Sequence, residues 1–126
     1  MNPEKSTILV IEDDALLLGA IKIKLTEKKY RNICVSTAEE ALKILKKDRI
    51  DLIWLDLLLP GMDGFELLEK IKKDNLYKDI PVIIVSNVDS EEKISSALKY
   101  EVYNYLVKSD FSLADIIKKI EDILDK

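Results

Sequence analysis

Short apolar runs alternate with amphipathic stretches along the whole chain. The runs occupy residues 7–11, 33–35, 52–55, 82–85 and 103–107. After each run, apolar residues recur three and four positions apart, which is the spacing of a helix with one buried face. Five strand–helix units in succession predict an α/β fold, in which helices cover both faces of a parallel sheet.

The order of the strands follows from the same pattern. The runs at 52–55 and 82–85 are apolar throughout, as strands buried on both faces must be. Short connections and right-handed crossovers leave few topologies. We therefore expect the doubly wound order 2-1-3-4-5 of a flavodoxin-like (βα)5 sandwich, which reverses between the first and third strands.

Polar residues mark the expected helix starts. Thr37 with Glu40 three positions later forms a capping-box pattern, and Ser90 and Ser112 each precede a helical repeat. Asp14 is interpreted as the cap of the first helix rather than as a metal ligand.

Composition indicates one domain and narrows the classes of function. The 126 residues are 48% apolar and 35% charged, enough for a core without disulfides, so we expect residues 1–126 to form a single domain with no effector domain. A net charge of −4 argues against direct binding of nucleic acid or of an anionic membrane. A single cysteine, no signal-peptide pattern at residues 1–6 and no apolar run of membrane-spanning length favour a cytoplasmic location. Cys34 and Trp54 are expected in the core.

Three acidic side chains are expected to meet at the carboxyl edge of the sheet. Glu12 and Asp13 follow the first apolar run, and Asp56 follows the third. Ligands bind where the strand order reverses, so these carboxylates should face one crevice. Their repulsion would keep one of them protonated unless a cation neutralises them. Because the chain has no histidine, the site would hold a hard ion through oxygen, which favours Mg²⁺.

Two further polar residues end the remaining core strands. Ser86 follows the run at 82–85, and Lys108 follows the run at 103–107. A metal, an ammonium and a hydroxyl around one carboxylate predict phosphoryl transfer. Asp56 would be the nucleophile, while Lys108 and Ser86 would bind phosphoryl oxygens.

Four segments stand in order at the expected strand ends: ILVIEDD at 8–14, LDLLLPGMDG at 55–64, VS at 85–86 and YLVK at 105–108. Through them the sequence resembles the receiver domain of two-component response regulators over essentially its whole length, as a single-domain, chemotaxis-regulator-like receiver. The resemblance implies a signalling switch rather than a turnover enzyme. Asp56 would accept a phosphoryl group from a phosphohistidine of a sensor histidine kinase or a histidine phosphotransfer protein.

The resemblance also implies a metal site. Asp13 would bind Mg²⁺ directly and Glu12 mostly through water. Asp56 and the backbone carbonyl of Leu58 would be the other protein ligands, and Mn²⁺ is an alternative ion.

A phosphoryl site and a switch are implied in the same way. Lys108, Ser86 and the backbone of Asn87 would bind the phosphoryl group. Ser86 would move toward it and Tyr105 would follow, which would change affinity for a downstream protein at the helix 4–strand 5–helix 5 face. The protein would be a monomer or a phosphorylation-dependent dimer.

The chain departs from the common family pattern in three places. Asn87 replaces a small residue, Ser109 replaces proline, and Glu101-Val102 replaces a common Gly-Ala next to the partner surface. A cis bond before a non-proline residue costs about 3–4 kcal/mol, so the bond between Lys108 and Ser109 is expected to be trans.

Two apolar residues occupy positions that flank the path of attacking water in the family. Leu58 lies two residues after Asp56, and Val88 lies two after Ser86. Neither side chain can orient a water molecule, so we expect slow self-dephosphorylation.

Other functions are weighed against this one. An aspartate-nucleophile phosphatase would need a second acid where Leu58 stands. A flavin- or nucleotide-binding module would need a Gly- or Ser-rich loop after the first strand, where the acids of residues 12–14 would instead repel phosphate. A phosphorylation-independent protein-binding receiver is disfavoured by the intact Asp56, Ser86 and Lys108.

Five of the candidate site residues also have a simpler local interpretation. Glu12 and Asp13 would then be acids favoured at a helix start. Ser86 would be a strand-end hydroxyl, Lys108 a solvated lysine and Tyr105 ordinary packing.

Overall fold

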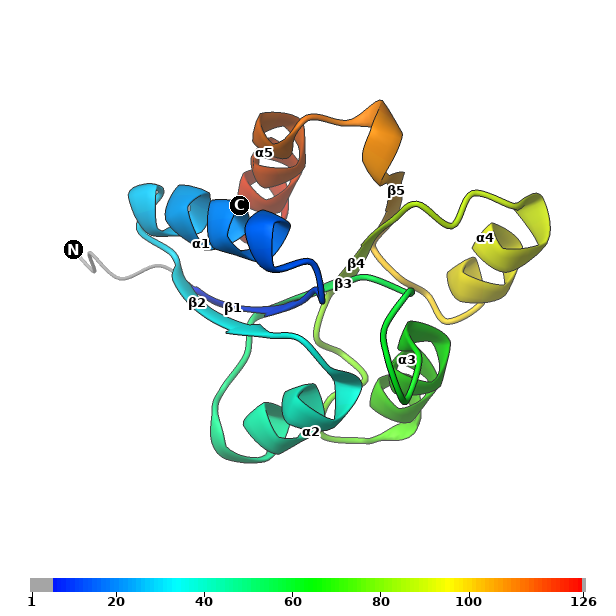
Figure 1. Cartoon of the computed structure of the whole chain (residues 1–126). Coiled ribbons are helices and arrows are strands. Elements are labelled where there is room, and N and C mark those ends of the chain that lie inside the picture. Colours follow the sequence, from blue (N-terminus) through cyan, green and yellow to red (C-terminus); the bar gives the residue numbers. More distant parts are fainter. Residues whose placement is uncertain (1–5, 126) are drawn as a thin grey trace.

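Five parallel strands form one sheet in the order β2-β1-β3-β4-β5, which confirms the predicted topology (Figure 1). The computed structural model describes residues 6–125, and residues 1–5 and 126 lie outside the described part. The prediction that residues 1–6 form no signal peptide therefore falls almost entirely outside the described residues. The strands are β1 Thr7–Ile11, β2 Arg31–Val35, β3 Leu52–Leu55, β4 Val82–Ser86 and β5 Asn104–Val107.

The predicted limits of three strands, β2, β5 and β4, need correction. β2 begins at Arg31 rather than at residue 33, because Arg31 pairs with Thr7 and the strand therefore includes polar residues outside the apolar run. β5 begins at Asn104, one residue later than expected. Pairing with Val107 also brings Ser86 into β4.

Helices cover both faces of the sheet (Figure 1). One face carries α1 Ala15–Glu27 and α5 Leu113–Leu124, and the other carries α2 Ala38–Lys47, α3 Gly64–Lys73 and α4 Glu91–Leu98. A short 3-10 turn, η1 Lys108–Asp110, follows β5. Among the described residues, no helix is long and apolar enough to cross a bilayer.

Alternation along β3 divides the core into two clusters. Ile53 and Leu55 pack toward α2, α3 and α4, whereas Leu52 and Trp54 pack toward α1 and α5. Trp54 is buried, as expected, but Cys34 on the edge strand β2 is only half-buried.

The predicted helix caps are confirmed, with one correction. The side chains of Asp14, Thr37, Ser90 and Ser112 each accept a backbone N–H bond at the start of a helix. The Glu40 carboxylate, however, accepts from the amide of Ser36, one residue before the cap, instead of from the amide of Thr37.

Gly64 packs directly against the backbone that follows the third strand. Its amide donates to the carbonyl of Leu57 at 3.0 Å. A Cβ added at Gly64 would lie 2.4 Å from Leu57 Cα and 2.6 Å from the carbonyl oxygen of Asp56. Because only glycine permits this approach, it holds the start of α3 against the loop that carries the candidate site.

Candidate phosphoryl and metal site

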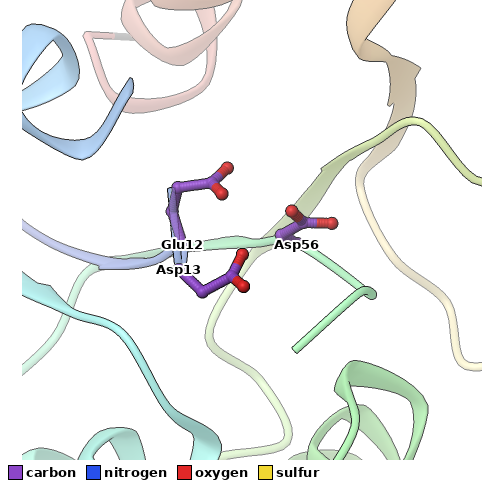
Figure 2. Close-up of side chains that lie close together, drawn as sticks. All are labelled: Glu12, Asp13 and Asp56. Atoms are coloured by element: carbon purple, nitrogen blue, oxygen red, sulfur yellow. The ribbon is translucent and has the colours of Figure 1, made fainter. Parts of the chain in front are cut away.

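The strand reversal brings three carboxylates together. β1 and β3 are neighbours, and the amide of Asp56 donates to the carbonyl of Ile11 at 3.1 Å, which aligns the two strand ends. Oxygens of Glu12, Asp13 and Asp56 lie within 4.8 Å of one another. Figure 2 shows the three side chains converging from the ends of the two strands. The predicted proximity is confirmed, while their role as ligands stays a prediction.

The three acids differ in burial. Glu12 is 1% exposed and Asp56 is 3% exposed, whereas Asp13 is exposed to solvent. Burial raises the pKa of Glu12, although hydrogen bonds from Lys108 and from the amide of Asp14, at 3.0 Å, act in the opposite direction. Glu12 is therefore a buried member of the cluster, and its contact with Lys108 is not explained by the simpler interpretation as an acid favoured at a helix start.

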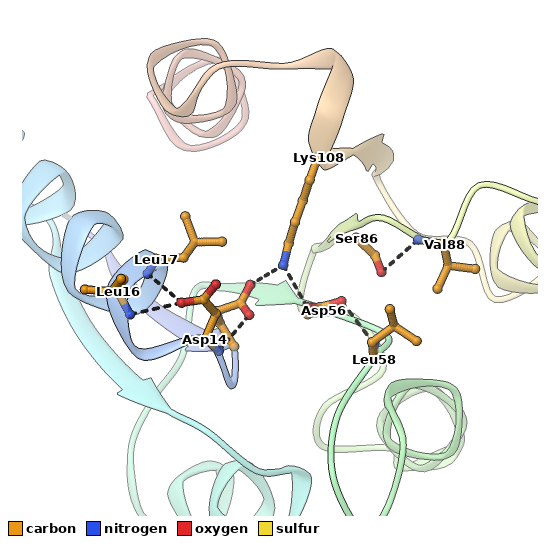
Figure 3. Close-up of polar contacts among 9 residues, drawn as sticks. Asp14, Leu16, Leu17, Asp56, Leu58, Ser86, Val88 and Lys108 are labelled. Carbon is orange, nitrogen blue, oxygen red and sulfur yellow. Dashed lines mark hydrogen bonds and ion pairs between the residues drawn. The ribbon is translucent and has the colours of Figure 1, made fainter.

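Lys108 supplies the positive charge of the cluster. Its Nζ lies 2.6 Å from Glu12 Oε1 and 2.8 Å from Asp56 Oδ2. Figure 3 shows the side chain reaching from the end of β5 toward Asp56. Burial acts to lower the pKa of Lys108, but its hydrogen bonds to Asp56 and Glu12 outweigh that effect and the pKa is raised. Lys108 is thus not a solvated surface lysine.

The two oxygens of Asp56 have different partners. Oδ1 accepts from the amide of Leu58 at 3.0 Å, and Oδ2 contacts Lys108. The Leu58 side chain is 57% exposed, so it lies at the open side of the cluster. The loop after it is further held by Glu39 of α2, whose Oε2 accepts from the amide of Met62 at 3.3 Å. No local motif pointed to Glu39, because this contact depends on where α2 lies against the sheet.

The predicted switch residues meet at Val88. Ser86 is fully buried, and its Oγ accepts from the Val88 amide at 3.3 Å. The Tyr105 hydroxyl donates to the Val88 carbonyl. Burial raises the pKa of Tyr105, as do the negative charges of Asp56 and Asp89. Ser86 and Tyr105 are therefore linked through one residue of the β4–α4 loop.

The three departures from the family pattern can be placed. Asn87 is exposed at the end of β4. The bond between Lys108 and Ser109 is trans, as expected. Glu101 adopts a left-handed backbone conformation with φ 59°, a conformation that glycine adopts more readily.

Comparison with known proteins gives the class of the chain. Residues 8–121 match the family described as the response regulator receiver domain. The chain therefore belongs to the receiver domains of response regulators, the class found in two-component signalling.

Individual relatives agree with this assignment. The chain is 32% identical over 102 residues to the transcriptional regulatory protein AfsQ1 of Streptomyces coelicolor, which covers 81% of this chain and 44% of that protein. It is 31% identical to the phosphorylated cyanobacterial phytochrome response regulator RcpA, with a TM-score of 0.85 over 95% of this chain and 94% of that chain. It is 28% identical to the Mn²⁺-bound form of response regulator Rcp1, with a TM-score of 0.81 over 94% of this chain and 91% of that chain.

The chain spans about half the length of the curated relatives it matches. The prediction that residues 1–126 act without an effector domain stays a prediction.

Proposed function

We propose that the chain is a phosphoacceptor switch. In this proposal Asp56 accepts a phosphoryl group from a phosphohistidine of a sensor histidine kinase or a histidine phosphotransfer protein. The observation that carries it is the convergence of three carboxylates within 4.8 Å, with the Lys108 ammonium 2.8 Å from Asp56. Phosphoryl transfer requires such a positioned nucleophile and positive charge. The phosphorylated form of RcpA, a relative of this chain, supports the proposal.

The donor set fits Mg²⁺. It consists of carboxylates without histidine or thiolate, the ligand type that hard cations prefer. Asp13 makes no hydrogen bond or ion pair within residues 6–125 and is free to bind an ion. Asp13, Asp56 and the Leu58 carbonyl would hold the ion, with Glu12 acting through water. When bound, it would neutralise charge on the phosphoryl oxygens. The Mn²⁺-bound form of Rcp1 supports the site and makes Mn²⁺ an alternative.

In this proposal Oδ2 of Asp56 is the attacking oxygen. Oδ1 accepts from the Leu58 amide, which orients the carboxylate, and Oδ2 lies 2.8 Å from the Lys108 ammonium that would stabilise the incoming phosphoryl group. The bond from Oδ2 to phosphorus forms as the bond from phosphorus to the donor imidazole breaks, and the imidazole leaves with that electron pair. Lys108 moves its hydrogen bond from Oδ2 to a phosphoryl oxygen. Ser86 and the backbone of Asn87 bind the others.

The contacts of Ser86 and Tyr105 with Val88 suggest how phosphorylation of Asp56 would change the surface that a partner binds. Phosphorylation replaces a charge of −1 by about −2 at Asp56. If Ser86 Oγ turns to the phosphoryl group, it leaves the Val88 amide, and the Tyr105 contact on the same residue changes with it. The α4–β5–α5 face would then bind a downstream protein with higher affinity. In this proposal the protein acts in the cytoplasm, as a monomer or a phosphorylation-dependent dimer.

A labelling experiment tests the proposal. The chain is incubated with Mg²⁺ and a small phosphodonor, and acid-labile phosphoryl groups are measured for wild type, Asp56→Asn and the control Asp89→Asn. Asp89 is an exposed carboxylate in the loop that follows β4. Labelling should be lost in Asp56→Asn, retained in Asp89→Asn and abolished by chelator. Equal labelling of Asp56→Asn and wild type would refute the assignment.

The same preparation distinguishes an aspartate-nucleophile phosphatase. Such an enzyme would hydrolyse a chromogenic phosphate ester continuously, because a second acid would activate water after each transfer. Leu58 occupies that position, so we expect at most one phosphoryl group per chain. Steady release of the chromophore that depends on Asp56 would instead favour the phosphatase.

A further inference from the structure

The turn between α4 and β5 is held in a conformation that disfavours its own residue. Glu101 has φ 59°, in the left-handed region that L side chains rarely adopt. Its amide donates to the carbonyl of Leu98 at 3.1 Å, and the amide of Tyr103 donates to the carbonyl of Val82 at 2.8 Å. A conformation of this kind persists when surrounding contacts fix it.

Lys72 of α3 makes such a contact with the α4–β5 turn. It lies in the last turn of α3, and its Nζ donates to the carbonyls of Lys78 at 3.2 Å and of Glu101 at 3.4 Å. One ammonium thus joins α3, the α3–β4 loop and the α4–β5 turn. Lys72 is half-buried, unlike its exposed neighbours Lys70 and Lys73 on the same helix.

The groups around Lys72 favour a positively charged side chain at this position. A cavity of about 510 Å³ is lined by Lys72, Lys78, Asp79, Lys99, Tyr100 and Glu101. Burial lowers the pKa of Lys72, while the charges of Glu101 and Asp79 act to raise it. The carbonyl groups of the α3–β4 loop and of the α4–β5 turn attract a cation, and the half-buried ammonium in turn is stabilised by these acceptors.

We propose that Lys72 is a positioning residue that fixes the left-handed α4–β5 turn through the carbonyl of Glu101. The turn leads directly into β5, so the restraint also acts on the start of the strand that carries Tyr105. This inference goes beyond the proposed phosphoryl transfer and does not depend on it.

Amide hydrogen exchange measured by NMR tests the proposal in the full chain. Lys72→Met removes the ammonium but preserves helix propensity, and Lys70→Met, an exposed lysine of the same helix, is the matched control. Exchange at the amides of Glu101 and Tyr103 should become about fivefold faster in Lys72→Met, the size expected for one lost hydrogen bond. It should stay unchanged in Lys70→Met. No acceleration, or equal acceleration in the control, would overturn the proposal.

A second substitution separates this role from general packing. Glycine adopts the left-handed conformation readily, so the turn in Glu101→Gly needs less support from Lys72. Adding Lys72→Met to Glu101→Gly should therefore accelerate amide exchange by less than half as much as adding it to the wild-type chain. A packing role would give equal acceleration in both backgrounds, spread over α3, and would contradict the proposal. Should Lys72→Met not fold, Lys72→Gln, whose shorter side chain lacks the ammonium, is measured with the same two criteria.

Discussion

Lys108 Nζ lies 2.6 Å from Glu12 Oε1, closer than the 2.8 Å that separates it from Asp56 Oδ2. The ammonium is therefore shared between two buried carboxylates that follow different strands. Removing the partner of a buried charge is strongly destabilising, because the remaining charge is left desolvated. In the protein without metal, this lysine compensates the charge that a bound cation would otherwise neutralise.

Lys108→Met should lower the free energy of unfolding by about 2–3 kcal/mol without metal, since it leaves Glu12 and Asp56 uncompensated. Mg²⁺ should recover much of this loss, so the rise in Tm on adding Mg²⁺ should be larger in the variant than in wild type. Urea and thermal unfolding with and without Mg²⁺ measure both effects. Lys118→Met, at an exposed position of α5, serves as the control. A stability loss that Mg²⁺ leaves unchanged would contradict the prediction.

Gly64→Ala should destabilise the chain by about 3 kcal/mol, because its Cβ would overlap backbone that cannot easily move. The atoms concerned are Leu57 Cα at 2.4 Å and the Asp56 carbonyl oxygen at 2.6 Å. Gly19→Ala is the opposite case, since a Cβ there meets nothing within 4 Å in the middle of α1. That change should stabilise by about 0.5–1 kcal/mol. Chemical denaturation compares the two, and similar effects of both changes would show that the close approach does not matter.

Local patterns predicted the parts of the molecule that depend on neighbours in sequence. Apolar runs located the strands, and Asp14 and Ser112 were found as caps because a cap acts within one helical turn. Topology then placed Glu12, Asp13 and Asp56 at one edge.

Contacts that depend on the final placement of whole elements could not be predicted. The shared Lys108 ammonium, the Glu39 contact with the loop after β3, and Lys72 at the Glu101 carbonyl join residues far apart in the chain. The polar start of β2 at Arg31 was missed for a related reason: an edge strand needs no continuous apolar run.

Leu58→Asn combined with Val88→Glu should shorten the lifetime of the phosphorylated protein by about tenfold or more, because polar side chains could orient the attacking water. Leu58 is 57% exposed beside Asp56, and Val88 is half-buried next to Ser86 (Figure 3). Decay of the acid-labile phosphoryl group is followed after the donor is removed. Leu76→Asn, at a leucine that is 82% exposed and belongs to the α3–β4 loop, should leave the decay unchanged. An unchanged decay rate in the double variant would show that these positions do not control hydrolysis.

Tyr30 should make stability depend on pH in the alkaline range. It is 3% exposed, and its hydroxyl donates to Asp125 at 3.2 Å. Burial raises its pKa, and the charges of Asp125 and Glu121 raise it further. Because the folded state holds the phenol proton more tightly, this contribution is complete below the unfolded-state pKa of about 10 and is lost as pH rises beyond it. Urea unfolding across that range should show a smaller alkaline loss in Tyr30→Phe than in wild type. Tyr103→Phe, at a side chain that is 51% exposed, should keep the wild-type slope; a Tyr30→Phe slope equal to that of wild type would assign the alkaline loss to other groups.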